Sequence, residues 1–133
     1  MKKIEHLGIA VRNIQESLKT FEKLLQKDCY KIEEVASEGV KTAFIQIGES
    51  KIELLESTRE DSPIHKFLEK RGEGLHHIAF EVEDIHQEIK RLGQEGFKLI
   101  NTEPHQGADN KLVAFVHPKS TGGILVELCQ DIA

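Results

Sequence analysis

The sequence contains two similar stretches, EHLGIAVRNI at residues 5–14 and HHIAFEVEDI at residues 76–85. Each stretch has a histidine at its second position, then an alternation of apolar residues that is typical of a strand. The two stretches are 71 residues apart, and the same separation relates Ala43 to Ala114 further along the chain. The similarity predicts that the chain is built from two copies of one module.

Apolar periodicity predicts the same order of elements in both copies, a strand, a helix and three more strands. The helices are expected to begin after Asn13 and Asp84, each followed three positions later by Glu16 or Gln87, as in a capping box. The expected strands cover residues 4–11, 30–35, 40–47 and 51–56 in the first copy, and 77–82, 97–101, 111–117 and 123–129 in the second.

These elements predict an α+β fold, in which two tandem β-α-β-β-β modules form one curved mixed eight-stranded sheet around a metal site. The whole chain, residues 1–133, is expected to be a single domain. Module one covers about residues 1–57, and module two covers about residues 75–130. A connecting helix is expected at residues 62–72, with Ser62 as N-cap and Pro63 at its first position.

Four potential metal ligands fall on one face of the predicted sheet. Glu53 alternates with apolar neighbours in one strand, as Glu127 does in another, and His6 and His77 occupy matching places in the two copies. Imidazole and carboxylate groups suit divalent ions such as Zn, Co, Ni, Mn or Fe(II), and the absence of thiolates from the set disfavours a closed structural zinc site. The pattern predicts one metal centre.

The other histidines and the cysteines carry weaker signals. A structural or surface role is expected for His65, His76, His86, His105 and His117. Cys129 falls on the same face as Glu127 and is interpreted as a small buried thiol.

The composition excludes several classes of protein. The net charge of −5 offers no basic stripe for nucleic acid. No apolar run approaches the roughly 20 residues of a membrane span. Two cysteines make no disulfide framework, and the first residues lead directly into a strand without a signal-peptide region, so a cytoplasmic location is expected.

The doubled histidine strands and inward glutamates resemble the vicinal oxygen chelate superfamily across essentially the whole chain. Within it, the chain resembles the methylmalonyl-CoA epimerases. This second resemblance rests on DSPI at residues 61–64, GLHHIAFEV at 74–82, HPKS at 117–120 and GGILVEL at 122–128. It implies that His6, Glu53, His77 and Glu127 bind a divalent ion such as Co, Zn, Ni or Mn, although some epimerases have Gln at the position of Glu53.

The resemblance also implies an acyl-CoA thioester substrate, a homodimer, and interconversion of (2R)- and (2S)-methylmalonyl-CoA. Glu127 would act as one base and take the proton from C2 of the substrate, and the metal would stabilise the enolate that forms. Some relatives carry a second glutamate where this chain has Thr42, so water or another group would serve the second face; Glu38 is a weaker candidate. Lys111 and Lys119 are considered as contacts for CoA phosphates.

Three alternatives remain at this stage. Glyoxalase I shares the fold and a similar ligand set, although the Ser62-Pro63 and HPKS phrases favour the epimerase. An extradiol dioxygenase would need two histidines and one carboxylate, which leaves one inward glutamate unexplained. A non-catalytic binding or resistance protein of the same fold would not need the metal.

Overall fold

The computed structural model describes residues 1–132 and divides the chain into two compact units. The N-terminal unit is His6–His76, and the C-terminal unit combines Met1–Glu5 with the chain from His77 onward. Residues 1–132 contain eight strands and three α-helices, in the predicted β-α-β-β-β order on both sides of the connecting helix. This confirms the α+β class and the two tandem modules, whereas the predicted single domain and its module bounds stay a prediction.

The N-terminal unit contains a mixed sheet in the order β2-β3-β4-β1. Strand β1 pairs in parallel with β4, and β3 pairs antiparallel with both β2 and β4. The bounds are β1 Lys3–Ala10, α1 Ile14–Leu25, β2 Lys31–Val35, β3 Val40–Ile47, β4 Ser50–Ser57 and α2 Pro63–Arg71. A 3-10 turn, Ala36–Glu38, precedes β3.

The C-terminal unit repeats this plan in the order β5-β8-β7-β6. Strand β5 pairs in parallel with β8, and β7 pairs antiparallel with both β8 and β6. The bounds are β5 Gly74–Glu81, α3 Ile85–Gln94, β6 His105–Gln106, β7 Lys111–Val116 and β8 Val126–Asp131.

The two main helices start in the same way. The side chains of Asn13 and Asp84 accept hydrogen bonds from the backbone N–H groups of Glu16 and Gln87, at 3.0 and 3.2 Å, which confirms both predicted N-caps. The first N–H of each helix is also bonded to a side chain. The Ile14 N–H donates a hydrogen bond to Glu56 on β4, and the Ile85 N–H donates one to Gln130 on β8. These bonds satisfy donors that a helix leaves unpaired at its N-terminus.

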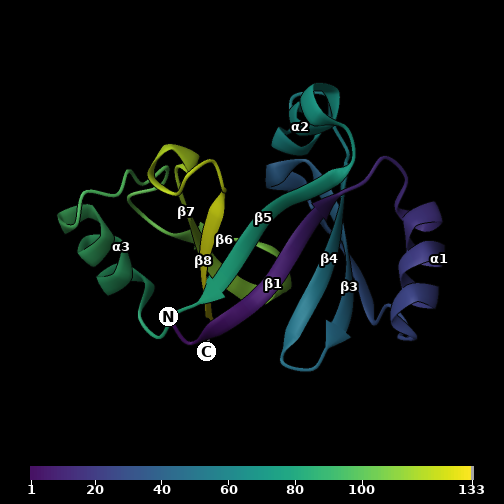
Figure 1. The fold of residues 1–133 in the computed structure, drawn as a ribbon, viewed down its shortest axis with the longest axis horizontal. Coiled ribbons are helices and arrows are strands. Elements are labelled where there is room, and N and C mark those ends of the chain that lie inside the picture. Colours follow the sequence, from purple (N-terminus) through teal and green to yellow (C-terminus); the bar gives the residue numbers. More distant parts are fainter. Residues whose placement is uncertain (133) are drawn as a thin grey trace. The chain divides into compact units, whose positions relative to one another are not determined.

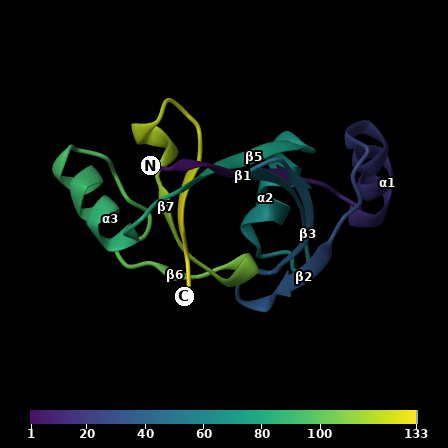
Figure 2. The same ribbon diagram turned by 90° about the horizontal axis from the view of Figure 1, so that it is seen from below.

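Each unit has its own hydrophobic core between helix and sheet. Helix α1 packs on β3 and β4 (Figure 1), where Ile14 and Leu18 meet Leu54. Helix α3 packs beside β7 and β8, as the turned view also shows (Figure 2), where Ile85 meets Leu128. The predicted connecting helix is confirmed as α2, and its side chains Ile64 and Leu68 pack against β1, β3 and β4 in the N-terminal unit.

The predicted strand at residues 97–101 is wrong. Only an isolated bridge from Leu99 to Val116 forms there, and the strand next to β7 is the two-residue β6. The side chain of Asn101 accepts the hydrogen bond of the Phe115 N–H at 2.9 Å, in the place where a backbone carbonyl would continue a ladder. Pro104 has no N–H to donate, and pairing with β7 resumes only after it, at His105.

No helix among the described residues is long and apolar enough to cross a membrane.

We expect Leu54→Ala to lower the free energy of unfolding by about 2–5 kcal/mol, because the fully buried side chain would leave a cavity between α1 and β4. Urea unfolding followed by circular dichroism measures the loss. Leu24→Ala is the control, because Leu24 is 70% exposed and its replacement should change stability by less than about 0.5 kcal/mol. Equal losses in both variants would contradict this assignment of the core.

Candidate functional site

A buried histidine and a buried glutamate form a close pair in the N-terminal unit. His6 lies on β1 and Glu53 on β4, and His6 Nδ1 is 3.1 Å from Glu53 Oε2. The parallel register pairs Gly8 with Glu53, so the glutamate lies beside the residue two positions after the histidine.

The C-terminal unit contains the equivalent pair. His77 on β5 and Glu127 on β8 approach to 3.2 Å between His77 Nε2 and Glu127 Oε1. Ala79, two positions after His77, is the register partner of Glu127. The two units therefore place a His and a Glu by the same strand pairing, as the sequence repeat predicted.

All four predicted ligands are buried, with residue exposures of 4–6%. Ionisable groups are rarely buried to this degree unless they are paired or bind a ligand. Both pairs belong to the groups of side chains that are able to hold a metal ion. Their role as ligands of one common ion stays a prediction.

An aromatic residue lies beside each glutamate. Phe44 on β3 is the register partner of Glu53, and Phe115 on β7 is the register partner of Glu127. The His77 ring meets the Phe115 ring edge-on, with 6.1 Å between centroids. Each ring places apolar surface next to a glutamate, which strengthens electrostatic interactions there.

Cys129 follows Glu127 by two residues on β8 and packs among apolar side chains. Cys129 is fully buried and clusters with Ala79 and Val113, and its thiol lies 3.5 Å from the carbonyl oxygen of Phe80. The interpretation of Cys129 as a small buried thiol agrees with these contacts. The nearby donor set is nitrogen and oxygen, which matches the divalent ions expected from the sequence.

Three of the remaining histidines make local contacts of a structural kind. His65 pairs with Glu69 along α2, and His76 meets the ring of Phe67 edge-on at 5.0 Å. His117 Nδ1 accepts from the Lys119 backbone N–H and so caps a short 3-10 turn.

Two buried charged residues were missed as a group by the sequence analysis. Glu5 and Lys111 both lie in the C-terminal unit, and Lys111 Nζ is 3.8 Å from Glu5 Oε2 and forms a closer ion pair with Asp131. Sequence alone gave Lys111 only a possible contact with CoA phosphates. Its burial among carboxylates indicates a structural role, whereas Lys119 is exposed.

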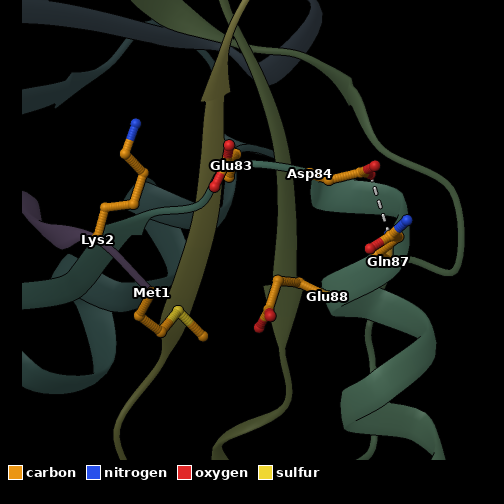
Figure 3. Close-up of a pocket in the computed structure, with 6 residues that line it drawn as sticks. All are labelled: Met1, Lys2, Glu83, Asp84, Gln87 and Glu88. Carbon is orange, nitrogen blue, oxygen red and sulfur yellow. Dashed lines mark hydrogen bonds between the residues drawn. The ribbon is translucent and has the colours of Figure 1, made fainter.

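An open cavity of about 530 Å³ lies near the start of α3 in the C-terminal unit. Figure 3 shows the hydrogen bond between Asp84 and Gln87 at the start of the helix, and Glu88 extending from the helix toward the side of Met1. Lys2 and Glu83 also line the cavity. Hydrogen bonds from Arg91 hold the pKa of Glu88 below its usual value. The lining residues all differ from the predicted ligands, and they are mostly exposed charges of a solvated surface.

Comparisons with known proteins identify the class. Residues 5–115 match the profile of the Glyoxalase/Bleomycin resistance protein/Dioxygenase superfamily, and the chain belongs to this superfamily. It is 42% identical over 130 residues to an uncharacterized protein of Bacillus subtilis, YqjC, covering 98% of this chain and 93% of that protein.

Within the superfamily the chain belongs with the methylmalonyl-CoA epimerases, as the sequence phrases predicted. It is 41% identical over 127 residues to the mitochondrial methylmalonyl-CoA epimerase of Dictyostelium discoideum, covering 95% of this chain and 76% of that protein. A variant of the Streptomyces coelicolor epimerase, solved with 2-nitronate-propionyl-CoA, superposes with a TM-score of 0.96 at 32% identity. That match covers 100% of this chain and 96% of the other.

We expect Lys111→Met to lower the free energy of unfolding by about 3–5 kcal/mol, because the buried Glu5 carboxylate would lose a buried positive charge. Chemical denaturation at neutral pH measures the change. The exposed Lys119→Met is the control and should stay within about 0.5 kcal/mol of the parent. A loss in the Lys111 variant as small as in the control would contradict a structural ion-pair network.

Proposed function

We propose that this protein interconverts (2R)- and (2S)-methylmalonyl-CoA. The observation that supports this most strongly is the buried His–Glu pair, which both units form with the same strand register. The chain that carries these pairs belongs with the methylmalonyl-CoA epimerases. The acyl-CoA ligand of the Streptomyces relative supports an acyl-CoA thioester as substrate class.

We further propose that His6, Glu53, His77 and Glu127 bind one divalent ion. The donor set fits such an ion, because two imidazoles and two carboxylates are buried and the nearby thiol of Cys129 is directed to a backbone carbonyl. When bound, the ion would act as a Lewis acid that makes the α-proton of a carbonyl substrate more acidic.

The glutamate of the second pair is the proposed base. Glu127 would accept the proton from C2, the C–H electron pair would move into the C1–C2 bond, and the thioester oxygen would gain the charge as an enolate. A water molecule would then donate a proton to the opposite face of C2, and Glu127 would release its proton to the hydroxide so formed, which regenerates the carboxylate. Glu127 is 6% exposed and lies beside Phe115 and His77, so bulk water has limited access to the face of C2 that Glu127 would deprotonate.

Protonation on the second face involves a different group. Thr42, at the position where some relatives have glutamate, is 1% exposed on β3, and a threonine hydroxyl is too weak a base to exchange a proton at neutral pH. Glu38 lies half-buried in the 3-10 turn before β3. We propose water as the second proton source.

Two further expectations from the sequence analysis stay predictions. A homodimer and a cytoplasmic location both agree with the proposed activity, and neither is needed for the chemistry assigned to the four ligand residues.

The proposed reaction is tested by deuterium incorporation at C2 of methylmalonyl-CoA in D2O, followed by mass spectrometry. The metal-loaded protein should incorporate deuterium and interconvert the two epimers, and a chelator-treated sample should not. Glu127→Gln keeps an oxygen ligand but loses the base, so exchange should fall by about 10²- to 10⁴-fold. No exchange by folded, metal-loaded parent protein would favour a hemithioacetal isomerase or a ligand-binding role.

The proposed metal centre is tested by the stoichiometry and affinity of divalent ions. We expect one ion per chain, and a loss of affinity of at least about tenfold in both His6→Ala and Glu127→Ala, because each removes a ligand from a different unit. Isothermal titration with Zn²⁺ or Co²⁺ measures both quantities. His65→Ala removes a helical histidine and should bind as the parent does. Two independent ions per chain would overturn the shared centre.

A further inference from the structure

A buried lysine lies close to the first predicted ligand pair. Lys51 on β4 is only 5% exposed, although a lysine side chain is almost never fully buried unless it is paired with another group. It precedes Glu53 by two residues, and the function proposed above does not use it.

The strand geometry places Lys51 on the face that carries the ligand pair. Residues two apart on a strand point to the same side, so Lys51 shares the face of Glu53. In the parallel pairing of β1 with β4, Lys51 is the register partner of His6. The lysine therefore adjoins both members of the pair.

The direction of the side chain is fixed by an aromatic contact. Lys51 Nζ lies 5.7 Å from the centroid of the Phe44 ring, within the range of a cation–π interaction. Phe44 is the register partner of Glu53, whereas Lys51 itself pairs with Gln46. The Lys51 side chain therefore extends along the strand direction, away from Gln46 and toward the position of Glu53.

The charges of the proposed reaction require a further cation. Two glutamate ligands balance a divalent ion, so a 2-carboxyacyl thioester adds one uncompensated negative charge on binding. Transfer of the C2 proton to Glu127 leaves this total charge unchanged, so the uncompensated charge persists through the reaction. A buried negative charge is costly unless it is paired with a positive group. The Lys51 ammonium is such a group on the ligand-bearing face.

We propose that Lys51 binds the free carboxylate of the acyl group and so selects 2-carboxyacyl thioesters over simple acyl thioesters. This inference rests on the function proposed above and adds the residue that recognises the substrate class. Because the carboxylate persists through the reaction, Lys51 stabilises the bound substrate and the transition state alike. Its loss raises KM and leaves kcat nearly unchanged.

The test compares two thioesters that differ only in the carboxylate, malonyl-CoA and acetyl-CoA, by isothermal titration of metal-loaded and metal-free protein. Lys51→Met is expected to weaken malonyl-CoA binding by about 10- to 100-fold, the range for a hydrogen bond to a charged group, and to leave acetyl-CoA binding unchanged. Lys51→Arg keeps the charge and is expected to retain most of the preference. In turnover assays the Lys51→Met variant raises KM for methylmalonyl-CoA.

Lys31→Met is the matched control. Lys31 Nζ also lies over the Phe44 ring, at 5.0 Å, but its side chain is 40% exposed on the edge strand β2. This variant removes a cation–π contact with the same ring and should keep the preference for malonyl-CoA. Lys51→Gln replaces Lys51→Met if circular dichroism shows that the methionine variant is unfolded.

The outcomes separate the two proposals. Equal weakening of both thioesters by Lys51→Met, or no weakening of either, would overturn the role of Lys51 while leaving epimerase activity of the parent intact. A parent protein that selects malonyl-CoA through Lys51 but exchanges no C2 proton would overturn the proposed function alone.

Discussion

The parallel pairing of the first and fourth strand of each module is the constraint on which the rest of the structure depends. In both units it sets a glutamate beside the residue two positions after a histidine, at Gly8 and at Ala79. A shift of one residue would turn the glutamate to the opposite face and separate it from the histidine. The cores beneath α1 and α3 hold this register, because their apolar side chains occupy the other face of the same strands.

Burial gives these residues their chemical character. A carboxylate in water is well solvated, whereas Glu53 and Glu127 are buried next to imidazoles and aromatic rings, where charge interactions are stronger and an unpaired charge is costly. Such an environment favours a cation, and it makes the total charge of any bound ligand matter. The buried lysines have different surroundings, since Lys111 lies among carboxylates of its own unit, whereas Lys51 leans over an aromatic ring toward a predicted ligand.

The fold was largely predictable where local signals agreed with one another. Asn13 and Asp84 were identified as caps because each has a side-chain oxygen and precedes by three residues the N–H group from which it accepts a hydrogen bond. Strand β3 was predicted with the bounds that the structure has. Residues 97–101 were misassigned because their apolar pattern resembles a strand. The side chain of Asn101 takes the hydrogen bond of Phe115 instead, and such competition depends on a partner distant in sequence.

The sequence by itself determined the repeat, the two helix starts and, within each module, the side of the strands that carries the His–Glu pair, because period-two alternation and capping depend on near neighbours. Only the tertiary structure decided the distance of each His–Glu pair, the direction of Lys51 over Phe44 and the burial of Lys111 with Glu5. These depend on strand register and on contacts between residues far apart along the chain, which local patterns do not encode.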